Sequence, residues 1–267
     1  MSTQSNKRSE NSIETAVARR MGVVDIGSNS VRLVIYDVVG RSIAPYFNEK
    51  VLAGLGARLA ETHRLNPKGV VAAMTALHRF KALMDAQGVD EIQVFATAAI
   101  READDGPEFC ARVRQDVGFA IKVLSGADEA KYAAVGVIAM QPDADGVSGD
   151  LGGSSLEFSQ ISGGFYTNGA TYPLGPLALR SVHEDDIDDP AHSPEMLGDL
   201  STPTDAIRKR IKQVLGDASE LRGAQSNFYM IGGAWRAIGR LHMELSDYPL
   251  RVLQNYEIPA DEMIALC

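Results

Sequence analysis

The chain has 267 residues, 45% hydrophobic and 23% charged, which suffices for one large domain or two smaller ones with hydrophobic cores. No stretch approaches the roughly 20 apolar residues of a membrane-spanning helix, and a net charge of -9 disfavours nonspecific binding to nucleic acid or acidic lipid. Two cysteines cannot form a disulfide framework and no signal-peptide core precedes Met21, so we expect a soluble, cytoplasmic protein.

The first 20 residues are polar, with few large apolar groups, and predict a disordered leader. The acidic Glu10 and Glu14 argue against the alternative, a transit peptide. From residue 22 the sequence predicts a strand, a tight turn and a second strand, because apolar residues alternate with others after a Gly-Ser-Asn-Ser turn.

Predicted helices and strands alternate along the rest of the first half. The helices span residues 66–84, 107–117 and 127–140, and the strands span residues 92–96 and 121–124. This alternation favours an α/β fold.

A nine-residue pattern occurs twice, beginning at Asp25 and at Asp150. Each copy reads Asp, apolar, Gly, small, Asn or Ser, Ser, apolar, charged, apolar, and each leads into a strand-like run that ends in a glycine turn. A helix near 204–215, a strand at 227–231 and a helix from 234 follow the second copy, in the order of the first half. We therefore predict a duplication, with one domain over residues 21–135 and another over 136–267.

The two loops have the composition of a phosphate-binding turn, in which backbone N–H groups converge on one anion. A single copy would more simply be an ordinary hairpin turn, but two matched copies favour a ligand site. Asp25 and Asp150 would repel phosphate unless a cation lay between, so they predict bound Mg²⁺. The candidate phosphate-binding residues are Gly27, Ser28, Asn29, Ser30, Gly152, Gly153, Ser154 and Ser155.

Together with residues 95–103, 124–130 and 231–239, the two loops resemble the exopolyphosphatase and guanosine pentaphosphate phosphohydrolase (Ppx/GppA) family, from about residue 22 to the end. The resemblance implies the actin, hexokinase and Hsp70 superfamily fold: two ribonuclease-H-like α/β domains with the ligand in the cleft between them. It also implies Mg²⁺-dependent hydrolysis of the terminal phosphoanhydride of inorganic polyphosphate, or of the 5′-γ-phosphate of guanosine pentaphosphate. Homodimers are frequent in the family.

By this resemblance, Glu129 takes the position of the family's catalytic glutamate, which orients or deprotonates the attacking water. Spacing alone supports equally a structural role at a helix N-terminus, with Ser125 as the N-cap and Asp128 at the third helical position. A helix N-terminus lowers a carboxylate's pKa, so we favour water orientation over full proton abstraction.

Two further charged residues are candidates for the site. Glu157 lies two residues after Ser155 on the outgoing strand, so it could bind metal or position water. The alternative is a charge on an exposed strand face. By resemblance, Arg101 clamps a phosphate; the alternative is a surface ion pair with a neighbour such as Glu102.

Some features depart from the family pattern. Ser154 stands where the family usually has a third glycine, and it would be strained if the loop needed positive φ there. Ser148 and Gly149 interrupt the strand before the second loop. The chain also stops before the family's closing helix and strand, so we expect an incomplete, less stable second domain with an unpaired sheet edge.

Some readings stay open. The glycine pair at 232–233 fits either close backbone approach to a ligand or tight strand-to-helix packing. Gly54 and Gly56 lack a third glycine and follow no clear strand, so they predict no dinucleotide site. The rival functions are a small-molecule kinase of the same superfamily and a noncatalytic protein that binds polyphosphate or a guanosine polyphosphate.

Overall fold

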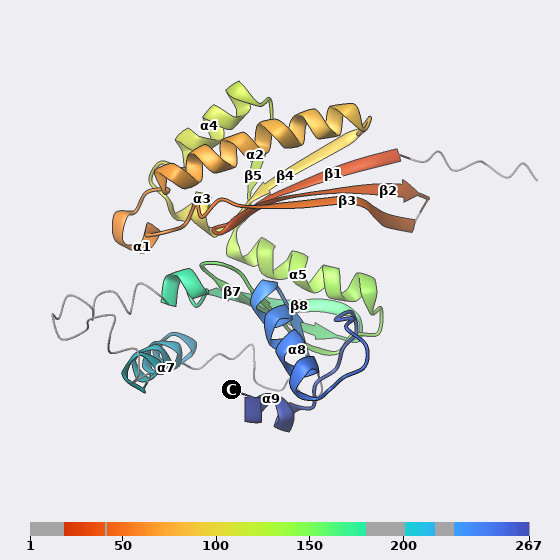
Figure 1. The fold of residues 1–267 in the computed structure, drawn as a ribbon, viewed down its shortest axis with the longest axis vertical. Helices are drawn as coiled ribbons and strands as arrows, with labels where there is room; N and C mark the ends of the chain where they lie inside the picture. The colour runs from red at the N-terminus through yellow and green to blue at the C-terminus, as the bar shows by residue number, and fades with distance from the viewer. Residues whose placement is uncertain (1–18, 41, 180–200, 217–226, 267) are drawn as a thin grey trace, which may run out of the picture.

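The computed structural model describes residues 19–40, 42–179, 201–216 and 227–266. Two separate β-sheets organise these residues, and helix α5 (Gly126–Met140) lies between them in Figure 1. The predicted α/β architecture of two ribonuclease-H-like units is confirmed by these two sheets, which share one pattern of connections.

The first sheet has the order β3-β2-β1-β4-β5. Its strands β1, β2 and β3 are antiparallel to one another, whereas β4 runs parallel to β1 and β5 runs parallel to β4. Helices α2 and α4 cover its outer face in Figure 1, and short helices α1 and α3 follow β3 and β4. The bounds are β1 (Arg19–Ile26), β2 (Ser30–Val39), β3 (Ser42–Leu52), α1 (Leu59–Thr62), α2 (Pro67–Ala86), β4 (Glu91–Ala96), α3 (Ala98–Glu102), α4 (Gly106–Asp116) and β5 (Ile121–Val123).

The second sheet has the order β8-β7-β6-β9, with β6, β7 and β8 antiparallel and β9 parallel to β6. Apolar residues of α5 and α7 pack against it in two small core clusters. The bounds are β6 (Gly146–Leu151), β7 (Leu156–Ser162), β8 (Phe165–Tyr172), α7 (Ser201–Leu215), β9 (Asn227–Ile231), α8 (Gly233–Leu245) and α9 (Ala260–Leu266).

The duplication predicted from the repeated pattern appears in the strand register. Asp25 pairs with Arg32 across β1 and β2, and Asp150 pairs with Glu157 across β6 and β7, so both aspartates oppose the residue seven positions later. Each intervening loop is closed by the same backbone hydrogen bond of 2.9 Å, from Gly27 N–H to the carbonyl of Ser30 and from Gly152 N–H to that of Ser155. The two halves therefore share local geometry as well as sequence pattern.

The predicted elements agree with the structure in order and type, and the differences have local causes. Strands β3 and β8 were not predicted. The sequence of β3 carries Pro45, Glu49 and Lys50; it is an edge strand, where proline and charge are tolerated, and its register shifts beside Pro45. This strand ends at Leu52, so Gly54 and Gly56 do follow a strand, contrary to the sequence-based expectation.

Strand β1 begins before the predicted end of the leader, so that prediction was wrong for its last two residues. The guanidinium of Arg20 donates to Asp37 at 2.8 Å and to the carbonyl of Gln87 at 2.9 Å, and it stacks over the ring of Tyr46. These contacts order a polar residue that composition alone assigned to disorder. The rest of the predicted leader lies outside the described residues.

Helix α5 packs against the second sheet along its length, with Ala130 and Ala134 buried and Val137 and Ile138 in the core cluster of that sheet. The predicted boundary between residues 135 and 136 falls inside this helix. The structure therefore groups the whole of α5 with the second unit, while the division into domains stays a prediction.

Two opposed serines in the second sheet differ in how their hydroxyls are satisfied. Ser148 and Ser159 are both 1% exposed, but only Ser159 has a partner, the carbonyl of Ala130 at 2.6 Å; the Ser148 hydroxyl has none among the described residues. Gly149 beside it leaves room for the ring of Phe228, which would lie 2.4 Å from an added Cβ. Ser148 and Gly149, which the sequence analysis saw as an interruption, therefore lie inside strand β6, and this strand contains an unpaired buried hydroxyl.

Ser148→Ala is expected to raise the free energy of unfolding by about 1 kcal/mol, because it removes a buried hydroxyl that no hydrogen bond compensates. Ser159→Ala is the matched control and should lower it by about 1 kcal/mol, because it removes a hydrogen bond and leaves the Ala130 carbonyl without it. Urea unfolding of the three proteins measures both values. Equal effects of the two substitutions would contradict the assignment.

Among the described residues, no helix is long and apolar enough to cross a membrane.

Candidate functional site

The two repeated loops lie against each other. A Cβ added to Gly153 would lie 3.2 Å from the Cβ of Ser28 and 3.3 Å from the backbone nitrogen of Asn29. One added to Gly56 would lie 2.9 Å from the Cβ of Ser28 and 3.3 Å from the hydroxyl of Ser154. The glycines therefore permit a close approach that brings both sets of predicted phosphate-binding residues to one place.

The loop backbones have free donors at this meeting point. Within the described part of the chain, the backbone N–H groups of Ser28, Asn29, Gly153 and Ser154 make no hydrogen bond. The carbonyl of Gly153, by contrast, is already paired, since it accepts from Leu177 N–H at 2.8 Å. Unpaired N–H groups directed away from the supporting backbone are typical of an anion-binding loop.

Ser154 does not have a positive φ, so the strain considered for a non-glycine residue here is absent. Ser28 and Ser155 are buried, whereas Asn29 is exposed and Ser30 and Ser154 are partly exposed. The serine that replaces the family's glycine thus adds a hydroxyl beside the meeting point without distorting the backbone.

Asp25 and Asp150 end the two first strands and face the same site. Desolvation, followed by the charges of Glu157 and Asp25, raises the pKa of Asp150 to about 6, although the charge of Arg236 opposes the shift. Asp25 is exposed, yet the surrounding protein still raises its pKa by desolvation, while Arg32 and Lys50 lower it. Asp150 is therefore costly to ionise unless a further positive charge approaches.

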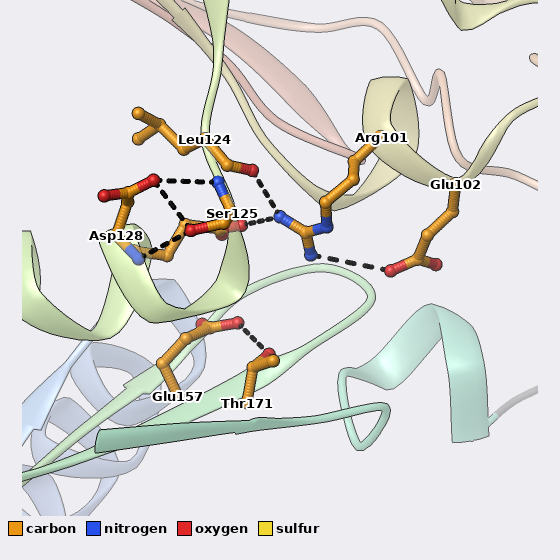
Figure 2. Close-up of polar contacts among 8 residues, drawn as sticks. Arg101, Glu102, Leu124, Ser125, Asp128, Glu157 and Thr171 are labelled. Atoms are coloured by element: carbon orange, nitrogen blue, oxygen red, sulfur yellow. Dashed lines mark hydrogen bonds and ion pairs between the residues drawn. The ribbon is translucent and has the colours of Figure 1, made fainter. Parts of the chain in front are cut away.

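Glu157 is 3% exposed, so the alternative of a surface charge on an exposed strand is wrong. Desolvation and the charge of Glu129 raise its pKa to about 7, although hydrogen bonds from Ser155 and Thr171 and the charge of Arg101 oppose the shift. Thr171 donates its hydroxyl to Glu157 Oε1 at 2.8 Å (Figure 2). Glu157 is thus a buried acid directed toward the other carboxylates.

Glu129 lies in the first turn of α5, and the preceding residue, Asp128, forms the capping box with Ser125. Ser125 Oγ accepts from Asp128 N–H at 3.1 Å and Asp128 Oδ2 accepts from Ser125 N–H at 3.2 Å, which completes a capping box. Glu129 is left to pair with Arg101. Desolvation raises the pKa of Glu129 despite Arg101, so the predicted lowering by the helix N-terminus is wrong because burial outweighs it.

Arg101 extends from α3 of the first unit to the N-terminus of α5 (Figure 2). Its Nη1 donates to the carbonyl of Leu124 at 2.8 Å and forms an ion pair with Glu129, and its Nη2 lies 3.5 Å from Glu102. The surface ion pair considered from the sequence exists, but the buried partner is Glu129. Arg101 is therefore a cation held beside the carboxylates at the meeting point of the two units.

The carboxylates have the donor chemistry that Mg²⁺ prefers, and burial is the main cause of the raised pKa values of Asp150 and Glu157. In the described ranges, however, no three His, Cys, Asp or Glu side chains converge closely enough to hold a metal ion by themselves. Mg²⁺ is usually bound by one or two carboxylates together with water and phosphate oxygens. One or two of Asp25, Asp150 and Glu157 could supply the protein's part of such a shell.

The glycine pair after β9 packs tightly. Gly232 has φ 110° as the N-cap of α8, and an added Cβ would lie 2.5 Å from the carbonyl of Leu151 and 3.1 Å from Asp150 Oδ1. Only glycine fits both conditions. The packing interpretation is therefore confirmed, and the turn also borders the carboxylate of Asp150.

The sequence analysis missed three residues that shape the site. Gly56 lies against Ser28 of one loop and Ser154 of the other. Gly175 supports the second loop, since its N–H donates to the carbonyl of Ser154 at 3.1 Å, and Thr171 donates a hydrogen bond to Glu157. None belongs to a repeated or charged pattern, and each reaches the site from another strand or loop. Only the register of β7 and β8 reveals Thr171, since it lies opposite Glu157.

Comparison with known proteins gives one family. Residues 34–267 match the model of the Ppx/GppA phosphatase family. Exopolyphosphatase 1 of Mycobacterium tuberculosis is 29% identical over 143 residues, covering 52% of this chain and 42% of that protein. Exopolyphosphatase 2 of the same organism is 25% identical over 264 residues, covering 93% and 78%.

A crystal structure of an exopolyphosphatase from Cytophaga hutchinsonii has a TM-score of 0.78 with 21% identity, covering 93% of this chain and 78% of that one. At 21% identity this similarity shows a shared fold and no more. The chain spans about two fifths of the length of the first relative above.

Proposed function

The chain belongs to the Ppx/GppA phosphatase family, and from this premise we propose that it hydrolyses the terminal phosphoanhydride of inorganic polyphosphate with Mg²⁺ bound. Guanosine pentaphosphate is the second candidate substrate, since it also presents a terminal phosphate. The relatives named exopolyphosphatase support the first choice.

One observation carries the proposal: the free backbone donors of the two loops lie next to the strand ends that carry Asp25, Asp150 and the buried Glu157. The N–H groups of Ser28, Asn29, Gly153 and Ser154 suit the oxygens of a phosphate. Phosphoryl transfer depends mainly on positioning of the attacking water and on neutralisation of the charge on the phosphate oxygens. Backbone donors, carboxylates and a bound cation are the types of group that do this.

In the proposed reaction, the oxygen of a water molecule bonds to the terminal phosphorus as the bridging P–O bond breaks. The products are orthophosphate and a polymer one phosphate shorter. Glu129 orients the water, and its raised pKa also suits it to accept the proton that the water loses. Arg101, which pairs with Glu129 in the absence of ligand, would donate to phosphate oxygens.

Asp25, Asp150 and Glu157 are the residues that would hold Mg²⁺ together with substrate oxygens. When bound, the cation neutralises negative charge on the phosphate and the carboxylates. The raised pKa values of Asp150 and Glu157 are consistent with a site that lacks this charge.

The test is orthophosphate release from long-chain polyphosphate and, in parallel, from guanosine pentaphosphate, each with Mg²⁺ or with EDTA. The expected result is release that requires the metal. Binding of either compound by folded protein without release would replace the hydrolase with a noncatalytic binding function. Transfer of the terminal phosphate of ATP to an acceptor, without orthophosphate release, would favour the kinase.

Gly56→Ala is expected to lower the release rate at least about 10-fold, because contacts below 3.0 Å to a Cβ are not tolerated and the two loops must separate. Gly136→Ala is the matched control, since an added Cβ there meets nothing within 4 Å and α5 gains a better helix former. Initial rates with matched thermal melts measure the effect. Full activity of Gly56→Ala would show that the close approach of the loops is unimportant.

A further inference from the structure

Thr171 bonds to Glu157 and lies against the helix that carries Glu129. On β8 it is the register partner of Glu157 on β7, and its hydroxyl donates to Glu157 Oε1 at 2.8 Å. Figure 2 shows this pair directly below the N-terminus of α5, the helix that carries Glu129. The bond selects one direction for the buried carboxylate.

Gly126 brings the first turn of α5 into contact with the same threonine. A Cβ added to Gly126 would lie 2.2 Å from Thr171 Cγ2 and 2.8 Å from its Cβ. Since Glu129 follows three residues later on this helix, Thr171 touches the element that carries one acid and bonds directly to the other.

The duplicated halves carry different residues at this position. In the first sheet, register places Asp25, Arg32 and Lys50 in one row across β1, β2 and β3. In the second, the same row is Asp150, Glu157 and Thr171 across β6, β7 and β8. A neutral hydroxyl thus stands where the other half has a lysine, and it donates a hydrogen bond without adding a charge.

We propose that Thr171 is a positioning residue for Glu157: its hydroxyl holds the carboxylate toward the place where the two loops meet. The proposal rests on the proposed hydrolase function. Without this donor Glu157 would remain buried and keep only its hydrogen bond with Ser155, so its carboxylate could rotate about that contact. The rate of the chemical step would then fall while polyphosphate binding by the loops would persist.

The test compares Thr171→Val, which removes the hydroxyl at similar volume, with Thr171→Ser, which keeps it. Thr171 is exposed on an edge strand, so both variants should fold. Thr171→Val is expected to lower kcat at least about 10-fold with KM changed less than about 2-fold, and Thr171→Ser should recover most of the loss.

The Thr171→Val substitution in a Glu157→Met variant separates an effect on the position of Glu157 from a general effect on the structure. Glu157→Met removes the acceptor, so adding Thr171→Val to it should cause no further loss of kcat. Wild-type kcat in Thr171→Val, failure of serine to rescue, or an equal loss in both backgrounds would overturn the proposal.

Urea unfolding of wild type, Thr171→Val, Glu157→Met and the double variant tests the contact between the two residues without an activity assay. The shift in midpoint caused by Thr171→Val should be present with Glu157 and absent with Met at this position. If wild-type protein releases no phosphate, the proposed function fails on its own, and equal midpoint shifts in the two backgrounds would still overturn the role of Thr171.

Discussion

Glu129→Gln is expected to lower the rate of orthophosphate release from polyphosphate by about 10²- to 10⁴-fold, the usual contribution of a positioned acid or base. Glutamine keeps the shape of the side chain, but it cannot accept the proton of the attacking water or form the ion pair with Arg101. Initial rates at saturating substrate, with a thermal melt of each protein, measure the effect.

The neighbouring acid provides the control. Asp128→Asn changes a residue that closes the capping box with Ser125 and makes no recorded contact with Arg101. It should cost some stability and leave the rate within a few-fold of wild type. Equal losses in both variants would mean that only the helix start matters, and full activity of Glu129→Gln would remove the proposed role of this residue.

The ligand-free protein is expected to lose stability as the pH rises from about 4 to about 7. Asp150 and Glu157 have pKa values of about 6 and about 7 in the folded chain, above the ordinary values of 3.8 and 4.5. Between these limits the folded state binds more protons than the unfolded state, so the free energy of unfolding falls with pH, by up to about 1.4 kcal/mol per pH unit for each proton.

The measurement is a series of urea unfolding curves from pH 5 to pH 8 in EDTA. The expected decrease is on the order of a few kcal/mol, since burial of both acids dominates their pKa shifts. The double variant Asp150→Asn with Glu157→Gln should show a much flatter profile. A wild-type curve that rises over this range would contradict the assignment of these two raised pKa values.

Much of the fold could be predicted because the same nine-residue pattern occurs twice, and each copy specifies a strand, a turn and a strand. Asp25 and Asp150 then define equivalent strand ends, which the identical registers confirm. Helices with clear signals were also predictable: Asn66 caps α2 by accepting from Lys68 and Gly69. The family assignment, made from five ordered segments, is confirmed by the match over residues 34–267.

What could not be predicted depends on contacts between distant residues. The pKa direction of Glu129 required knowledge of its burial, which outweighs both the helix terminus and Arg101. Thr171 and Gly56 have no local signal, since a threonine on an edge strand and a glycine in a loop are common. Their importance follows only from what lies opposite them, Glu157 in one case and Ser28 in the other.

The two rows across the sheets also make the site electrically polar. The row of the first sheet adds Arg32 and Lys50 to its aspartate, whereas that of the second adds an acid and a hydroxyl. An electric field therefore points from the first unit toward the second, along which an anionic chain experiences a directional force. We expect an incoming polyanion to settle on the side of Arg32 and Lys50, which leaves its terminal group facing the acids and gives the polymer one orientation of entry.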